Sequence, residues 1–409
     1  MIKISKKTLQ DLEYQSVIEQ IAELNVTSLG KTKILNTVPF SNRNEVNRSL
    51  NLTNEFLTSF ENENRIPNHG FENITKELNL IKIENNYLEI NGFRKIASCC
   101  ITSNILIKFF KKNKDYYPLL NTLSSTNEIN TIIPDAINEV IDKHGEIRNN
   151  ASDLLYSTRK SIQSIRTKVN SSFNSALSSY NSADYLDDIR ETVMENRRVL
   201  AVKSMHRRKV KGSILGSSKT GSIIYIEPET THQHQRELNN LEFEETEEIK
   251  RILLELTSLI SVYSNYLSKC QFNLTEIDVI YAKAKYAKSI HAVLPKITET
   301  QEIYLVDAYH PLLLVSNRKE ETKTYPQTIT MTKRSRIIVI SGPNAGGKSI
   351  TLKTVGLLQL MVQSGMLIPA HESSKVCLFD SILSDIGDNQ SIENHLSTYS
   401  YRLKQMNNF

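Results

Sequence analysis

The sequence predicts a mostly α-helical protein with an α/β domain of the P-loop kind toward its C-terminus. Three observations support this. Apolar residues recur every three or four positions over long stretches, a short β-like insert separates two of these stretches, and a glycine-rich loop lies between strand-like and helix-like segments. With 409 residues the chain can form two to four domains. Thirteen glycines and no tryptophan favour long helices over a β-sandwich.

Composition excludes several classes of protein. The formal net charge is only +5, so the distribution of charge is more informative than its total. The cysteines form no C-x-x-C pair, which argues against a zinc site or a disulfide framework and favours core thiols in a reducing compartment: Cys99, Cys100, Cys270 and Cys377. The N-terminal residues lack the apolar region of a signal peptide, and charges interrupt every candidate membrane span. We expect a soluble, cytoplasmic protein with no membrane partner.

Residues 1–133 are predicted to form a helical domain. Apolar periodicity indicates helices within residues 6–60, then near 71–83 and 91–113, and the polar segment Glu61–Gly70 is expected to be a loop. Nothing in this domain indicates chemistry. We interpret His69 and the Cys99–Cys100 pair as packing or surface residues rather than metal ligands.

Residues 134–295 are predicted to form a long helical arm. Apolar or small residues recur at helical spacing over 137–181 and again over 231–294, and a glycine-punctuated insert at 190–228 between them is expected to contain short strands. The first helix would be on the order of 60 Å long. Two such helices around a β insert predict an antiparallel arm that has the insert at its far end. An ordinary helical bundle with a surface hairpin is the alternative.

The β insert carries a strong local charge. Eight basic residues and no acidic residue lie between Arg197 and Lys219, whereas the helix that follows is rich in glutamate. A basic patch at the end of an arm predicts contact with a nucleic-acid backbone. The alternative is a solvated face that pairs with the acidic helix. The candidate phosphate contacts are Arg197, Arg198, Lys203, Arg207, Arg208, Lys209 and Lys211, with Lys219 as the eighth basic residue.

The stretch from Gly342 to Ser349 fits the P-loop pattern G-x-x-x-x-G-K-[ST]. The apolar run Ile337–Ile340 before it predicts a buried parallel strand, and the periodic segment after it predicts a helix that Gly365 can end. Further strands are expected near 303–306, 376–379 and 382–383. A glycine-rich turn with an accidental Gly-Lys-Ser sequence is the alternative reading.

This motif predicts a site for ATP and Mg²⁺. Backbone N–H groups of Asn344 to Lys348 would surround phosphate oxygens, Lys348 would reach the outer phosphates, and the Ser349 hydroxyl would ligate magnesium. The candidate nucleotide-binding residues are Gly342, Pro343, Asn344, Ala345, Gly346, Gly347, Lys348 and Ser349.

Several stretches together resemble the second branch of the MutS family, which is linked to recombination suppression and ribosome rescue. The main ones are Tyr309-His-Pro-Leu-Leu313, the Gly342–Ser349 loop and Leu396-Ser-Thr-Tyr399. Ser349–Leu358, Ile368-Pro-Ala370, Asp385-Ile-Gly-Asp388, Leu12-Glu-Tyr14 and Leu29-Gly-Lys31 are also similar. The resemblance implies a helical core and lever at 1–133, a clamp arm at 134–295, and part of a dimeric ABC-type ATPase domain at 296–409.

The resemblance also implies roles for single residues. Asn344 and Ser397 resemble family residues that contact ATP, Ser397 from the opposite subunit of a homodimer. A helix N-cap before Tyr399 is the alternative for Ser397. Tyr399 stands where family members usually have phenylalanine.

Three family features have no match in these 409 residues. They are the N-terminal mismatch-reading domain, an apolar strand ending in Asp-Glu (the Walker B element), and the C-terminal Smr nuclease domain. We therefore expect the N-terminal portion of a longer protein, or a disrupted gene.

Two functions from different classes remain open. One is a dimeric clamp, controlled by ATP, that acts on branched or mismatched DNA or on stalled ribosomes; the sequence does not choose between these targets. The other is a non-enzymatic nucleic-acid-binding fragment whose ATPase domain is inactive. A chromosome-organising ATPase is disfavoured, since its P-loop precedes the long helices, whereas here it follows them.

Overall fold

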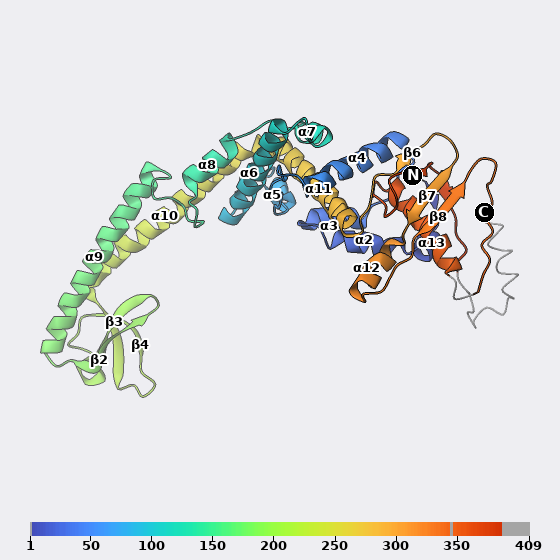
Figure 1. Cartoon of the computed structure of the whole chain (residues 1–409). Coiled ribbons are helices and arrows are strands. Elements are labelled where there is room, and N and C mark those ends of the chain that lie inside the picture. The colour runs from blue at the N-terminus through green and yellow to red at the C-terminus, as the bar shows by residue number, and fades with distance from the viewer. Residues whose placement is uncertain (1, 344–346, 387–409) are drawn as a thin grey trace. The chain divides into compact units, whose positions relative to one another are not determined.

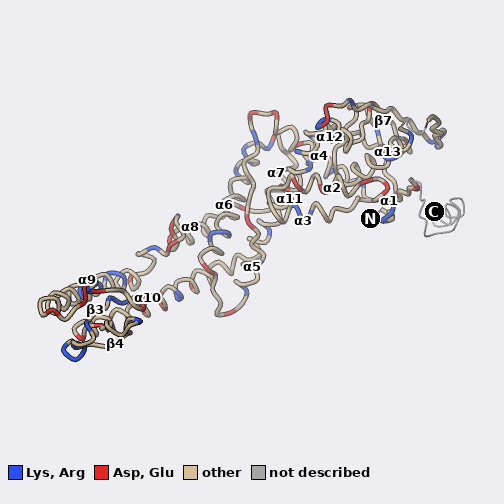
Figure 2. Tube along the Cα trace, turned by 90° about the horizontal axis from the view of Figure 1, so that it is seen from below, with Lys and Arg blue, Asp and Glu red and all other residues tan. Residues whose placement is uncertain are grey.

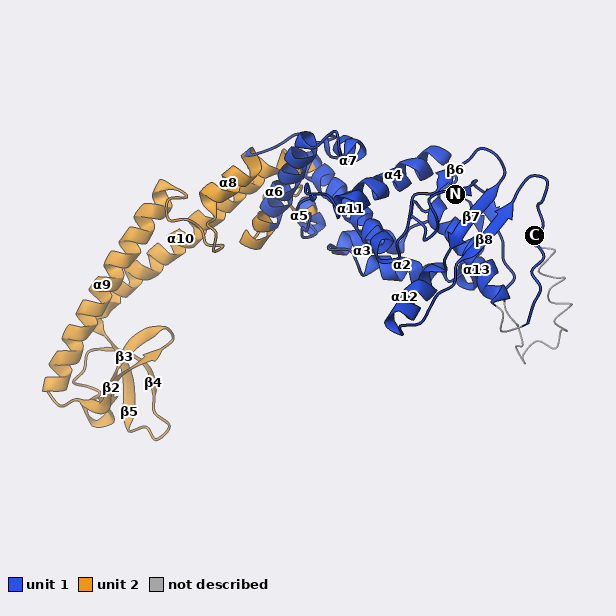
Figure 3. Cartoon of the chain, viewed as in Figure 1, with its two compact units in different colours: residues 1–78, 95–131, 265–409 blue, residues 79–94, 132–264 orange. Residues whose placement is uncertain are grey.

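The computed structural model describes residues 2–343 and 347–386. About half of the chain is helical, and the strands belong to small sheets (Figure 1). The chain divides into two compact units (Figure 3). Unit 1 contains residues 1–78, 95–131 and 265–409, and unit 2 contains residues 79–94 and 132–264. None of the described helices is long and apolar enough to cross a membrane.

Unit 1 begins with a short strand and four helices that match the predicted helical start of the chain. These are β1 (Lys3–Ile4), α1 (Lys6–Asp11), α2 (Tyr14–Ala22), α3 (Ser28–Leu35) and α4 (Arg43–Ser59). The expected loop at 61–70 follows. The next helices are α5 (Thr75–Leu80), α6 (Ile90–Lys112) and α7 (Pro118–Ser124), and α11 (Ser264–Ser289) returns to this unit later in the chain. The structure thus confirms helices near 71–83 and 91–113, although the first is shorter than expected.

The C-terminal part of unit 1 forms a small mixed sheet and the helix that follows the P-loop. The elements are β6 (Lys296–Ile297), β7 (Ile303–Ala308), α12 (Pro311–Lys319), β8 (Gln327–Met331), α13 (Lys348–Gln363), β9 (Lys375–Val376) and β10 (Ser381–Ile382). The sheet order is β6-β9-β7-β8. The sequence indicated β7, β9 and β10 but not β8, which lies just after Pro326 in a stretch that appeared to be a polar loop.

One hydrophobic core joins the beginning and end of unit 1. It includes Val17 of α2, Ala282 of α11 and Leu357 of α13, all less than 1% exposed. β1 pairs in parallel with β10, so Lys3 lies opposite Ser381. The first helices are therefore built into the same core as the P-loop helix, although more than 300 residues separate them. Sequence periodicity shows that each helix has an apolar face but not which faces meet.

The predicted buried strand at Ile337–Ile340 is wrong. These residues form no strand, and their exposed fractions are 82%, 42%, 86% and 36%. A β-strand is stable only where a neighbouring strand accepts and donates its backbone hydrogen bonds. Within the described residues no strand pairs with this segment, so its apolar side chains stay at the surface.

The main part of unit 2 is a pair of antiparallel helices and a four-stranded sheet. The helices α9 (Asp153–Ser182) and α10 (Glu229–Ser261) pack through Ile162, Ile165 and Leu238. The sheet is antiparallel in the order β2-β3-β5-β4, formed by β2 (Leu186–Met194), β3 (Arg197–Lys203), β4 (Gly212–Ser217) and β5 (Ile223–Pro228), with the 3-10 turn η1 (Ser204–His206) after β3. Phe173 of α9 packs into its core. The β insert is thus present, and its first strand starts four residues before the expected boundary at 190.

The prediction of one unbroken helix over 137–181 is wrong. The helix α8 (Ile132–Val140) ends first, and α9 starts only at Asp153. Ile141 and Ile147 belong to the apolar pattern that predicted the helix, but they face each other across a turn as an antiparallel bridge. The Asp142 carboxylate closes this turn by accepting the N–H groups of His144 (2.8 Å) and Glu146 (2.9 Å), and Gly145 supplies a positive φ of 86°. Local side-chain bonds therefore override the apolar period.

The second long helix is also interrupted. α10 ends at Ser261 and α11 begins at Ser264, with Val262 80% exposed between them. α11 ends at Ser289 rather than near 294, and the N–H of Ala292 bonds back to the carbonyl of Ala287. No glycine or proline marks either place, which is why the sequence pattern appeared continuous.

Candidate functional site

The P-loop motif lies directly before a helix. Gly347 has a left-handed φ of 79°, and α13 begins at the next residue, Lys348. Its first backbone N–H groups have no partner one turn earlier, so they point out of the helix end, where the helix dipole is positive. The Lys348 ammonium donates to the carbonyl of Gly342, the first residue of the motif. The start of α13, the Lys348 side chain and the first glycine of the motif therefore lie close together.

The residues present fit a bound triphosphate at this place. Apart from the chain neighbours, none of the described residues lies within 4 Å of where a Cβ on Gly342 or Gly347 would be, so those residues leave the space beside these two glycines open. The Lys348 ammonium already binds an oxygen of the loop, as it would bind a phosphate oxygen. Asn344, Ala345, Gly346 and Ser397 lie outside the described residues.

The C-terminal end of α13 is held in the core by hydrogen bonds that the sequence did not reveal. Lys283 of α11 donates to the Ser364 carbonyl (2.7 Å), and the hydroxyls of Tyr14 and Ser364 lie 2.7 Å apart. Burial, and to a lesser extent the charge of Lys33, lowers the pKa of Lys283 to about 8. A lysine in an apolar helix pattern resembles a surface residue, so no sequence signal marked it.

The basic residues of the β insert fall into two groups. Three are partly buried and paired: Arg197 with Glu227 (3.0 Å), Arg198 with Glu191 (2.6 Å) and Lys203 with Asp184 (2.7 Å). The other five are exposed, and no acidic side chain in the described part of the chain pairs with them: Arg207, Arg208, Lys209, Lys211 and Lys219. Lys209 lies over the Tyr185 ring (5.2 Å). Figure 2 shows blue segments, which are Lys or Arg, around β3 and β4.

The acidic helix has other partners. Glu245 and Glu242 of α10 pair with Arg159 (2.7 Å) and Arg166 (2.8 Å) of α9. Glu248 accepts from Ser152 (2.6 Å) and from Arg251 (2.6 Å). None of the eight basic residues pairs with a glutamate of α10 among the described residues. The glutamates therefore hold α9 to α10 and leave the exposed basic residues available.

Comparison with known proteins agrees with these motifs. A family model described as MutS domain V matches residues 338–409. The chain is 31% identical over 407 residues to "Endonuclease MutS2" of Alkaliphilus oremlandii, covering 99% of this chain and 51% of that protein. It is 34% identical over 402 residues to the protein of the same name from Pediococcus pentosaceus, covering 97% and 50%. These matches support a place for this chain in the MutS2 branch of the MutS family. It spans about half the length of these curated relatives.

Several of the described stretches that resemble the MutS2 branch lie against one another, whereas Leu396–Tyr399 lies outside the described residues. The N–H of Tyr309 bonds to the carbonyl of Pro369 (2.9 Å), which joins two of them. Glu13 pairs with Lys353 of α13 (2.8 Å). His310 is 6% exposed; burial lowers its pKa, Glu13 opposes that shift and Lys353 adds to it. Motifs far apart in sequence thus surround the base of the P-loop helix.

The Leu29-Gly30-Lys31 stretch of the MutS2 resemblance also has a physical explanation. A Cβ on Gly30 would lie 2.1 Å from the carboxylate oxygen Oδ2 of Asp278. Asp278 is fully buried and accepts from the N–H groups of Val26 (2.9 Å) and Thr27 (3.0 Å). Only glycine leaves room for that carboxylate. No sequence signal marks Asp278, because its partners are more than 200 residues away.

Proposed function

We propose that this chain is the ATP-binding and nucleic-acid-clamping portion of a MutS-like protein. The observation that carries the proposal is that α13 begins at Lys348, at the end of a segment that has the P-loop sequence. Lys348 and the first N–H groups of α13 would bind the phosphates of ATP, and Ser349 would ligate Mg²⁺. When bound, Mg²⁺ would neutralise charge on the outer phosphates.

The nucleic-acid contact is assigned to the five exposed basic residues of the β insert. Lysine and arginine side chains on strands and turns, without a recognition helix, suit contacts to phosphates rather than to base edges. We therefore propose that binding depends on the shape of the nucleic acid, as for branched or mismatched DNA or the RNA of a stalled ribosome. ATP would control the clamp in a homodimer to which Ser397 contributes from the opposite subunit.

The proposal is tested by nucleotide binding to the 409-residue chain. Fluorescent ATP should bind in the presence of Mg²⁺, and Lys348→Ala should weaken binding by about tenfold to a hundredfold, because a charge-assisted contact to phosphate is lost. Lys333→Ala, which removes an exposed lysine outside the motif, is the matched control. Equal affinity of both variants would overturn the assignment of the P-loop.

Measuring ATP turnover by the same two variants and the unchanged chain distinguishes an ATPase from a binding module. In these 409 residues no apolar strand ending in Asp-Glu follows the P-loop, so we expect ATP binding with negligible steady-state turnover. Sustained phosphate release that Lys348→Ala abolishes would show that another carboxylate, such as Asp385 or Asp388, takes this role. Sedimentation with and without ATP tests the proposed dimer.

A further inference from the structure

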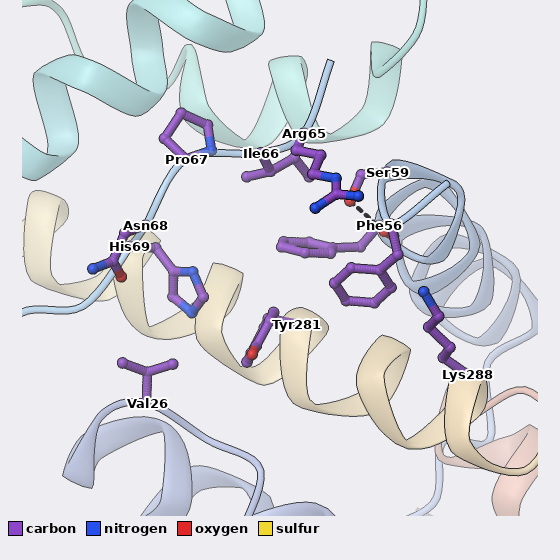
Figure 4. Close-up of a pocket in the computed structure, with 11 residues that line it drawn as sticks. Val26, Phe56, Ser59, Arg65, Ile66, Pro67, Asn68, His69, Tyr281 and Lys288 are labelled. Carbon is purple, nitrogen blue, oxygen red and sulfur yellow. Dashed lines mark hydrogen bonds between the residues drawn. The ribbon is translucent and has the colours of Figure 1, made fainter. Parts of the chain in front are cut away.

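A cavity in unit 1 is separate from both proposed sites. Its volume is about 310 Å³, and it lies between the end of α4, the loop at 65–69 and α11 (Figure 4). This volume is at the lower end of the range for pockets that hold small molecules. None of its lining residues belongs to the P-loop or to the β insert.

Aromatic rings form the walls of this cavity. The ring of Tyr281 lies 4.8 Å from that of His69, 5.6 Å from Phe56 and 6.0 Å from Phe60. Tyr281 and Phe60 remain partly exposed, whereas Phe56 and His69 are almost fully buried. Such walls favour a planar ring, since an aromatic ligand gains both apolar burial and edge or face contacts.

The charge of the lining residues indicates what accompanies the planar ring in the ligand. Figure 4 shows Arg65, Phe56 and Lys288 at one end of the cavity and His69 and Val26 at the other. The Arg65 side chain has no ion-pair partner in the described part of the chain, and the Lys288 ammonium lies 5.4 Å over the Phe60 ring. No Asp or Glu is among the described lining residues. An aromatic cage for a cation would be disfavoured here, whereas an anionic group would meet two positive charges.

The wall opposite the positive end is held by hydrogen bonds to one buried carboxylate. The Asp278 carboxylate holds His69 (3.0 Å) and the hydroxyl of Thr27 (2.5 Å) as well as the N–H groups of Val26 and Thr27. One buried group therefore fixes the loop at 65–69 and the turn before α3 against α11. A cavity with fixed walls binds a ligand without ordering them first.

We propose that this cavity binds a nucleotide unit, with the base against Tyr281 and Phe60 and the phosphate between Arg65 and Lys288. A free nucleoside monophosphate and the 5′-phosphorylated end of a nucleic acid present the same ring and anion. The site is independent of the P-loop, because it uses other residues and a monophosphate rather than a triphosphate. The helical part of unit 1 would then bind a ligand of its own.

The experiment is calorimetry on the 409-residue chain carrying Lys348→Ala, so that the P-loop contributes little. The probes are AMP, a 5′-phosphorylated trinucleotide, adenosine and inorganic phosphate. We expect AMP, the trinucleotide or both to bind at least tenfold more tightly than adenosine or phosphate. Which of the two binds more tightly identifies the source of the nucleotide.

Two sets of variants test the assignment of residues. Arg65→Gln with Lys288→Gln should lower the affinity for the phosphorylated probe at least tenfold, to the level of adenosine. Lys285→Gln is the matched control, because Lys285 lies 5.3 Å over the Tyr281 ring but does not line the cavity. Since these side chains are exposed, their replacement should leave the fold intact.

Three results would overturn the proposal. One is no binding of either phosphorylated probe at millimolar concentration. Another is that neither AMP nor the trinucleotide binds more tightly than adenosine. The third is binding of the tighter phosphorylated probe that persists in the Arg65→Gln, Lys288→Gln variant while circular dichroism shows the chain to be folded.

Discussion

Helix α11 and the β insert both carry charged residues, but they use them in opposite ways. Asp278 and Lys283 of α11 are buried and bonded to segments far away in the sequence. Arg207, Arg208 and Lys209 of the insert are exposed and form no ion pair among the described residues. Buried charges must be satisfied inside the fold, so they stabilise it, whereas exposed unpaired charges are available to a partner. Substitutions in the two regions should therefore separate stability from binding.

The largest effect on stability is expected for Asp278→Ala. It leaves the buried N–H of Thr27 and the partly buried N–H of Val26 without an acceptor, which should lower the free energy of unfolding by about 3–5 kcal/mol. Urea denaturation followed by circular dichroism measures this change. Glu276→Ala on the same helix is the control: its carboxylate pairs with Lys33 at a partly exposed position and should change stability by less than about 1 kcal/mol. Equal effects of the two variants would refute the role given to Asp278.

The contribution of Asp278 should depend on pH in a defined direction. Burial alone would raise its pKa, yet hydrogen bonds from His69, Thr27 and Val26 outweigh burial and hold the pKa below its ordinary value of 3.8. A carboxyl group with a lowered pKa in the folded state stabilises the fold above pH 3.8, and this stabilisation is lost as the pH falls through the folded-state pKa. The difference between wild type and Asp278→Ala should therefore be constant near neutral pH and shrink in acid.

A smaller effect, with the same sign but in an alkaline pH window, is expected at Lys283. Its pKa falls from 10.5 in the unfolded chain to about 8 in the fold. The unfolded state therefore binds more protons between these values, so wild type should gain stability relative to Lys283→Met as the pH rises from 8 to 10.5. The gain should approach about 3 kcal/mol. If the difference in stability between wild type and Lys283→Met did not change with pH, burial would not lower the pKa of Lys283.

The smallest effect on stability, with a large effect on binding, is expected in the β insert. Changing Arg207, Arg208 and Lys209 to Glu should alter the free energy of unfolding by no more than about 0.5 kcal/mol. The same triple variant should weaken binding to all nucleic acids alike, by at least about a hundredfold at low salt, and should flatten the plot of log affinity against log salt by up to about three units.

A second triple variant provides the matched comparison for the insert. Arg197, Arg198 and Lys203 are paired within the insert, so changing them to Gln should cost stability and leave the salt slope of binding nearly unchanged. If both triple variants weakened binding equally, the division of the basic residues into paired and exposed groups would have no functional meaning.

Local patterns were enough to predict much of this chain. The glycine-rich loop followed by a helix, the helices of the first 60 residues and the β insert could all be predicted, because each depends on neighbours within a few positions. The basic stretch between Arg197 and Lys219 was also visible in the sequence, although its division into two groups was not.

Long-range pairing decided the rest. Ile337–Ile340 has the composition of a buried strand, but a strand needs a partner that its own sequence does not contain, and those residues stay exposed. The turn closed by Asp142 interrupts a regular apolar period with two hydrogen bonds. Asp278, Lys283 and the cavity beside Tyr281 depend on segments that lie hundreds of residues apart in sequence, and only the tertiary structure brings them into contact. Periodicity specifies which face of an element is apolar, whereas packing specifies which faces, and which buried charges, meet.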